Sequence, residues 1–304
     1  MNILFTGLNG LTGSYLAKLI LNSEILNQND YASISRNYKD DYLTLASRSL
    51  VNKEYIGDCR DIEFLKNTIK SFKPDLIVHL AQINLTKYLL EVLNKIEYRG
   101  RIFVLGTTAV FSKFEICSGP YIEAEKLLKN SCFEFQVLRS SLIYGSCFDK
   151  NFHKLFDAIN NRKLIPLPGN GKSLYQPIYY KDLSKVIFQL IFRESFNYGF
   201  YNCTGYETLS LKEIVELIGE VLNKKPCVVN VPLNLSYKIL SIAEKLTLKS
   251  NIKIPINSEQ ILRLNEDKVY KSSLDILKND FKLLSLKEGI YEQANEKYFN
   301  FDKK

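Results

Sequence analysis

A glycine-rich turn directly after the first apolar segment is the feature that most constrains this chain. Residues 2–6 form a short apolar run, which is typical of a buried strand. Glycines follow at positions 7, 10 and 13, and residues 15–20 have the apolar spacing of a helix. A strand, a glycine turn and a helix in this order predict a dinucleotide-binding unit, with a purely structural turn as the alternative.

Each glycine has its own task in such a unit. Gly7 permits the tight turn off the strand, Gly10 lets backbone amides approach a pyrophosphate, and Gly13 lets the helix pack close to the sheet. The residues that we expect to line the dinucleotide at this turn are Gly7, Asn9, Gly10, Leu11 and Gly13.

Apolar runs alternate with helical segments over the first half of the chain. We expect strands at residues 2–6, 31–35, 53–57, 74–81, 101–106 and 134–139. Continuous apolar strands separated by helices predict an α/β fold, a Rossmann-type doubly wound parallel sheet with helices on both faces. Further along, we expect a turn-rich segment at 164–171, a helix at 180–192 and strands at 199–203 and 227–231.

The later chain predicts a smaller, mainly helical C-terminal substrate lobe. The expected domains are a dinucleotide-binding Rossmann domain of residues 1–162, to which 173–204 return, and a substrate-binding lobe of residues 205–304 with 163–172. Ligands of open α/β sheets bind at the carboxyl ends of the strands. We therefore expect the lobe to lie over those ends.

The end of the second predicted strand bears on the choice of cofactor. NAD-binding sheets commonly carry an acid there for the ribose hydroxyl, whereas an arginine suits the 2′-phosphate of NADP. This chain has Ser35 and Arg36, with no acid until Asp40. The sequence therefore favours NADP, with NAD as the alternative.

Composition bears on metals, nucleic acid and membranes. The chain has six cysteines without a CxxC pair and only two histidines, so we expect no metal site. Its net charge of +8 comes from lysines mixed with acids, which favours a solvated surface over nucleic-acid binding. Because no apolar run is long enough to span a bilayer and the N-terminus does not read as a signal peptide, we expect a cytoplasmic protein without a membrane partner.

Several further segments carry a family resemblance. They are Gly57-Asp-Cys-Arg-Asp61, His79-Leu-Ala81, Leu138-Arg139 with Tyr144-Gly145, the segment 169–183, and the segment 201–214. In this order the chain resembles the extended short-chain dehydrogenase/reductases, the NAD-dependent epimerase/dehydratases. The resemblance implies an NAD(P)-dependent oxidoreductase of the epimerase/dehydratase type, acting on a nucleotide-activated sugar or a similar carbonyl or alcohol substrate and compatible with a homodimer. It also implies that Asp58 meets the adenine and that Cys59, Leu80 and Ala81 line the cofactor.

The family's chemistry needs a Ser or Thr, and a Tyr followed four residues later by a Lys. Thr107 meets the first requirement, and Tyr121 is the candidate for the proton, but Glu125 follows it at the fourth position. Lys126 is one step further, on another face of the helix. A second register, anchored on the separation between Glu125 and Arg139, places Tyr121 at the lysine position and Cys117 at the tyrosine position.

Because its Tyr/Lys pair is incomplete, the chain resembles an atypical branch of the family. That branch includes bacterial relatives of the nucleotide-binding accessory subunit of respiratory complex I. Segments 231–233 and 255–268 are similar to that branch too. It implies a second hypothesis, a dinucleotide-binding protein without turnover that serves as a redox sensor, assembly subunit or regulatory module. We expect His79 to be a satisfied core or cofactor-lining residue and Asp182 to cap the following helix.

Overall fold

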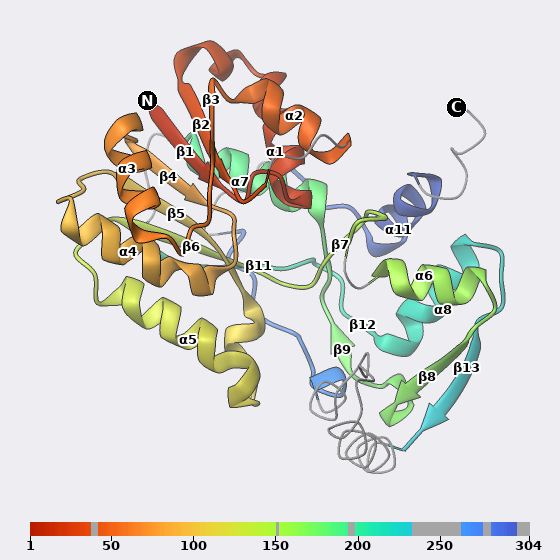
Figure 1. The fold of residues 1–304 in the computed structure, drawn as a ribbon. Helices are drawn as coiled ribbons and strands as arrows, with labels where there is room; N and C mark the ends of the chain where they lie inside the picture. Colours follow the sequence, from red (N-terminus) through yellow and green to blue (C-terminus); the bar gives the residue numbers. More distant parts are fainter. Residues whose placement is uncertain (38–41, 150–151, 194–197, 233–262, 276–280, 297–304) are drawn as a thin grey trace, which may run out of the picture. The chain divides into compact units, whose positions relative to one another are not determined.

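The computed structural model describes the chain except for residues 38–41, 150–151, 194–197, 233–262, 276–280 and 297–304. The chain divides into two compact units (Figure 1). The first unit comprises residues 1–141, 180–203 and 272–282. The second comprises residues 142–179, 204–271 and 283–304.

Seven parallel strands form the sheet of the first unit, in the spatial order β11-β6-β5-β4-β1-β2-β3. Their bounds are β1 Asn2–Thr6, β2 Asp30–Ser35, β3 Lys53–Ile56, β4 Leu76–His79, β5 Arg101–Thr107, β6 Phe135–Ser140 and β11 Gly199–Cys203. Each of these strands falls on an apolar run that the sequence predicted. The Rossmann-type parallel sheet is thereby confirmed.

Helices cover both faces of this sheet (Figure 1). One face carries α3 Ile62–Phe72, α4 Thr86–Lys95 and α5 Glu115–Lys129; the other carries α1 Leu11–Leu21, α2 Tyr42–Leu50 and α7 Tyr180–Ile191. Short 3-10 turns join them: η1 Glu24–Gln28, η2 Ile83–Leu85 and η3 Thr108–Phe111. Alternation along β1 explains the two layers, since Leu4 packs in the apolar core with α3–α5 while Ile3 and Phe5 are buried outside that core.

The second unit is built from short strands and helices. Its described elements are β7 Ile143–Tyr144, α6 Phe152–Asn160, β8 Leu164–Pro168, η4 Gly169–Gly171, β9 Leu174–Tyr175, β10 Ile178–Tyr179, β12 Leu209–Ser210, α8 Leu211–Val221, β13 Cys227–Val231 and α11 Leu286–Ala294. The helical pattern expected for the C-terminal lobe after residue 231 falls partly on residues 233–262, 276–280 and 297–304, which lie outside the described residues.

The prediction of a turn-rich segment at 164–171 was wrong for its first half. Residues 164–168 form β8, which pairs in parallel with β13, the strand predicted at 227–231. Pro166 and Pro168 lack a backbone N–H, and a two-stranded sheet leaves each strand an unpaired edge that tolerates this loss.

The two units differ from the predicted domain ranges: residues 142–162, 173–179 and 204 lie in the second unit, and residues 272–282 lie in the first. Contacts explain the two longest of these differences. Residues 142–162 lie in the second unit, where β7 pairs with β10. Residues 272–282 lie in the first unit, where the backbone N–H of Ser273 donates to the carbonyl of Asn202 on β11 at 2.8 Å. Both differences come from contacts distant in sequence.

Candidate functional site

The glycine turn lies at the carboxyl end of β1, beside the end of β4. Gly7 has φ +75°, and a Cβ there would lie 2.6 Å from the backbone nitrogen of Ala81. Gly13 has no room for a Cβ either, because the backbone oxygen of Leu8 stands in its way. The N–H of Gly10 donates to the carbonyl of Gly7 at 3.0 Å and closes the turn. Glycine is therefore required at positions 7 and 13.

The N-terminus of α1 follows this turn without a side-chain cap. Gly10 is the N-cap residue, no side-chain cap hydrogen bond is present among the described residues, and the first turn holds no acid. The first backbone N–H groups of a helix have no partner within it, and the helix dipole makes this end positive. The turn and the helix end fit the pyrophosphate of a dinucleotide.

His79 ties the end of β4 to the end of β1. It is fully buried, with Nδ1 lying 2.7 Å from Thr6 Oγ1 and Nε2 lying 3.3 Å from the carbonyl oxygen of Gln82. A carbonyl only accepts, so Nε2 carries the proton and the Thr6 hydroxyl donates to Nδ1. Burial lowers the pKa of His79 to about 4. His79 is thus a satisfied neutral core residue that holds Leu80 and Ala81 against the glycine turn.

The residues predicted for the adenosine half gather at the ends of β2 and β3. Asp58 accepts hydrogen bonds from Arg60 Nε at 3.0 Å and Nη2 at 2.7 Å, and these bonds lower the pKa of its carboxyl to about 2. The exposed Arg36 makes a smaller contribution to the same lowering. Burial raises the pKa of Cys59 to about 11. Ser35, the last residue of β2, accepts the Gly57 N–H at its carbonyl at 2.9 Å.

The sequence analysis did not identify one carboxylate that lies near the ends of β2 and β3. Asn9 Nδ2 in the glycine turn donates to Ser35 Oγ at 2.8 Å and to Glu54 Oε1 at 3.5 Å. Glu54 belongs to β3, where it pairs in register with Ser33 of β2. The sequence analysis considered acidic residues at the end of the second strand only, whereas Glu54 lies on the neighbouring strand. An acidic residue within a predicted strand was the sequence feature that could have indicated it.

Thr107 ends β5, as predicted for the first catalytic position. Its Oγ1 accepts the backbone N–H of Ala109 at 3.2 Å and caps η3, which packs against α5. Tyr121 is half-buried on α5 and packs against the core beneath α3–α5. Because α5 begins at Glu115, Tyr121 lies inside the helix and not at its start. Among the described residues, no hydrogen bond joins Thr107 to Tyr121.

A largely buried ion pair anchors α5 to β6. Arg139 Nε and Nη2 donate to the two carboxylate oxygens of Glu125 at 2.7 and 2.6 Å. The guanidinium also lies over the rings of Phe111 and Phe200, 4.9 and 4.8 Å from their centroids. These two residues are the anchors of the second register, in which Cys117 and Tyr121 would occupy the family's tyrosine and lysine positions, and that assignment stays a prediction. Lys126 is exposed.

Asp182 lies in the first turn of α7 and not before it. Its carboxylate is buried and accepts from Lys185 Nζ at 3.0 Å, one turn later. The predicted capping position is therefore wrong by three residues, because α7 begins at Tyr180 and its N-cap is the residue before it. A carboxylate in the first turn still complements the positive end of the helix.

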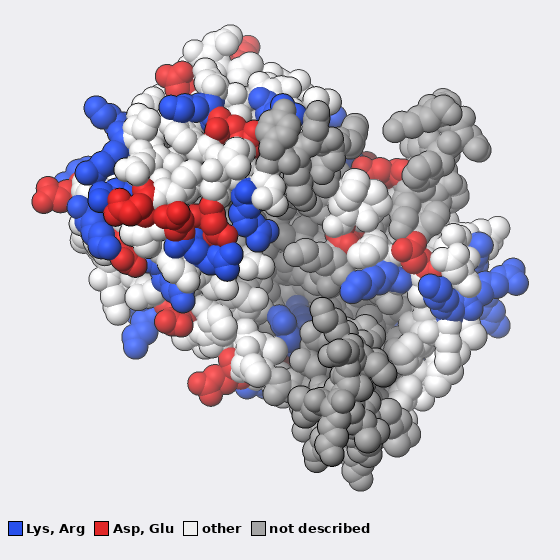
Figure 2. All heavy atoms as spheres, in the orientation of Figure 1, with Lys and Arg blue, Asp and Glu red and all other residues white. Residues whose placement is uncertain are grey.

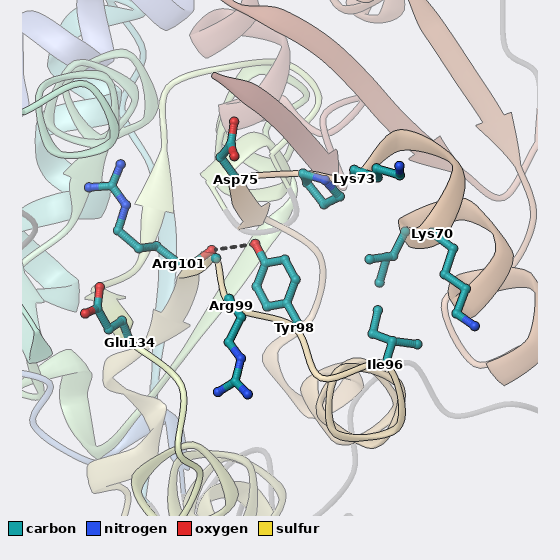
Figure 3. A pocket seen from close by; sticks show the side chains of 11 residues that line it. Lys70, Lys73, Asp75, Ile96, Tyr98, Arg99, Arg101 and Glu134 are labelled. Carbon is teal, nitrogen blue, oxygen red and sulfur yellow. Dashed lines mark hydrogen bonds between the residues drawn. The ribbon is translucent and has the colours of Figure 1, made fainter.

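A cavity of about 640 Å³ opens on the first unit at the amino ends of the strands, opposite the end that carries the glycine turn (Figure 3). It is lined at the amino ends of β4 and β5 by Asp75 and Arg101, and by Tyr98, whose hydroxyl donates to the carbonyl oxygen of Arg101 at 3.2 Å. The charged ends of Lys70 and Arg99 lie well apart there, on either side of Ile96 in the view (Figure 3). Because ligands of such sheets bind at the carboxyl ends of the strands, a cavity at the amino ends is not in the position expected for the dinucleotide.

The described residues bear on three other predictions. Over the face of the first unit that Figure 2 shows, basic and acidic side chains lie interspersed. Within the described ranges, no three or more His, Cys, Asp or Glu side chains cluster as metal ligands would. None of the described helices combines the length and apolar character that a membrane span needs.

Solved structures of sugar-nucleotide enzymes resemble this chain. They include dTDP-glucose 4,6-dehydratase of Bacillus anthracis with NAD, at 18% identity and a TM-score of 0.71, covering 99% of this chain and 98% of that one. UDP-glucose 4-epimerase of Thermotoga maritima with UDP-glucose shares 15% identity at a TM-score of 0.70, covering 97% and 98%. UDP-glucuronic acid 4-epimerase of Bacillus cereus, with UDP-glucuronic acid and NAD, shares 17% at 0.71, covering 97% and 98%. No curated protein sequence matches significantly.

A Rossmann sheet whose first strand leads through a glycine turn into an uncapped helix defines a dinucleotide-binding α/β protein. The profile of the NAD dependent epimerase/dehydratase family matches residues 3–203. The chain belongs to this family, as its motifs predicted.

Proposed function

We propose that this chain is an NAD(P)-dependent oxidoreductase that acts on a nucleotide-activated sugar. The observation that carries the proposal is the glycine turn, where no Cβ fits at Gly7 and no side chain caps α1, in a chain of this family. The substrate class is supported by the structural neighbours, which include enzymes solved with UDP-glucose and with UDP-glucuronic acid. The nicotinamide would supply hydride transfer.

The chain's own residues would then hold the cofactor and move a proton. The proposed cofactor contacts are Gly7, Asn9, Gly10, Leu11, Gly13, Ser35, Arg36, Asp58, Cys59, Leu80 and Ala81. Thr107 Oγ1 already accepts the Ala109 N–H, so its hydroxyl hydrogen can be donated to a substrate oxygen. Tyr121, or a water molecule, would exchange the proton.

We expect Thr107→Val and Tyr121→Phe each to lower kcat by about 100-fold or more, the usual size of a lost polarising or proton-transfer group. The measurement is steady-state turnover of candidate UDP- and dTDP-sugars with NAD and NADP. Tyr88→Phe is the matched control, because Tyr88 is also half-buried against the same core. Full activity in both variants would remove these residue assignments.

The second candidate is a dinucleotide-binding protein without turnover. It is favoured by the position of Tyr121, which packs against the core, and by Glu125 at the place where the family's lysine would follow it. In that case NADH or NADPH would bind to the native chain while a broad panel of sugar nucleotides gives no turnover. The similarity to the complex I accessory branch and the homodimer both stay predictions.

For the cofactor we propose the predicted preference for NADP, which rests on the exposed Arg36 directly after β2. Arg36→Ala is expected to weaken NADPH binding by about 10- to 100-fold, because it removes a charge-assisted contact to the 2′-phosphate. NADH binding should change little, as fluorescence titration would measure. Arg99→Ala, at the opposite edge of the sheet, is the control. Equal losses for both cofactors would contradict the charge argument.

A further inference from the structure

Glu54 places a carboxylate where the second strand of the sheet meets the glycine turn. Its backbone pairs in register with Ser33 of β2, and its neighbour Tyr55 packs toward α3–α5. Side chains alternate along a strand, so Glu54 projects from the face that carries α1 and α2. The side chain is half-buried.

Asn9 links the Glu54 carboxylate to the glycine turn, where we propose that the dinucleotide binds. Its side-chain amide donates to both Ser35 Oγ, at 2.8 Å, and Glu54 Oε1, at 3.5 Å, from within the glycine turn. Among the described residues no Lys, Arg or His forms an ion pair with Glu54. A half-buried carboxylate with one long hydrogen bond retains capacity to accept further donors, and a ligand hydroxyl could supply one.

We propose that Glu54 accepts a hydrogen bond from the 2′-hydroxyl of the adenosine ribose. Sheets of this class normally present that acid from the end of the second strand. Here Ser35 stands at that end, and the carboxylate comes from β3 through the pairing of the two strands. The inference rests on the proposed function only in that a nicotinamide dinucleotide binds at this turn.

The same charge disfavours a 2′-phosphate and therefore opposes Arg36. Arg36 lies on the side of Asp58, where its positive charge helps to lower the pKa of that carboxyl behind the larger contribution of Arg60. Glu54 lies on the side of Asn9. The cofactor preference of the native chain is the balance of these two opposite charges, and either one can be removed alone.

The experiment titrates NADH and NADPH by fluorescence into the native chain and Glu54→Gln. The Kd for NADH should rise about 5- to 10-fold in the variant, because a charged acceptor is replaced by a neutral one. The Kd for NADPH should fall, so that the NADPH-to-NADH ratio of Kd values decreases at least 10-fold. Glu63→Gln, an exposed carboxylate on α3, is the charge-matched control and should leave the ratio unchanged.

A ligand variant separates a hydrogen bond from a change in folding. NADH lacking the 2′-hydroxyl should bind the native chain more weakly than NADH, and this loss should be smaller in Glu54→Gln, whose neutral amide oxygen is a weaker acceptor. Circular dichroism and the thermal midpoint would show that the variant is folded. A ratio of Kd values that stays within twofold of the native one overturns the role of Glu54. Absence of binding by either dinucleotide to the native chain would instead overturn the proposed function.

Discussion

Arg139→Met is expected to lower the free energy of unfolding by about 3–5 kcal/mol, the usual cost of removing one partner of a buried ion pair. Glu125 would then keep a carboxylate that is only 10% exposed and has lost both donors. The substitution also removes the guanidinium from the rings of Phe111 and Phe200. Urea denaturation followed by circular dichroism measures the change.

Two comparisons separate this effect from a general loss of surface charge. Lys95→Met breaks the exposed pair with Glu91 and should cost less than about 1 kcal/mol. The double variant Glu125→Leu with Arg139→Met leaves no unpaired charge and should recover a large part of the loss. A cost of less than about 1 kcal/mol for Arg139→Met alone would contradict the buried-pair argument.

The strands and the glycine turn were predictable because local chemistry determines them. A continuous apolar strand such as residues 2–6 is typical of a parallel sheet that is covered on both faces. No residue other than glycine fits at positions 7 and 13, because backbone atoms stand where a Cβ would lie. The segment 164–168 was missed because its prolines resemble a turn. Its pairing with β13 depends on residues far along the chain.

Residues of the candidate site could be predicted only where they belong to a single sequence motif. Glu54 belongs to the third strand, and only the register between β2 and β3 brings it beside Asn9. The separation between Glu125 and Arg139 matched the family resemblance, but their ion pair and the packing of Tyr121 against the core depend on how α5 packs. Side-chain partners across elements require tertiary packing, which periodicity does not encode.

We expect the free energy of unfolding to fall by about 3 kcal/mol as the pH decreases from about 6.5 to 4, through His79 alone. Burial lowers the pKa of native His79 to about 4, whereas the unfolded chain titrates near the ordinary value of about 6.5. Between these values the unfolded chain binds a proton that native His79 does not bind. Stability from this group is therefore complete above about pH 6.5, and acid removes it.

His79→Gln isolates this contribution because glutamine does not titrate. The variant should be less stable than the native chain at pH 7, since glutamine leaves the Thr6 hydroxyl without its ring acceptor. Its stability should nevertheless fall less between pH 6.5 and 4, so the two curves converge in acid. His153→Gln, which removes the other histidine, should keep the native slope that His79 produces. Parallel curves for His79→Gln and the native chain would mean that His79 titrates in the folded chain as it does in the unfolded chain, which would contradict a buried neutral ring.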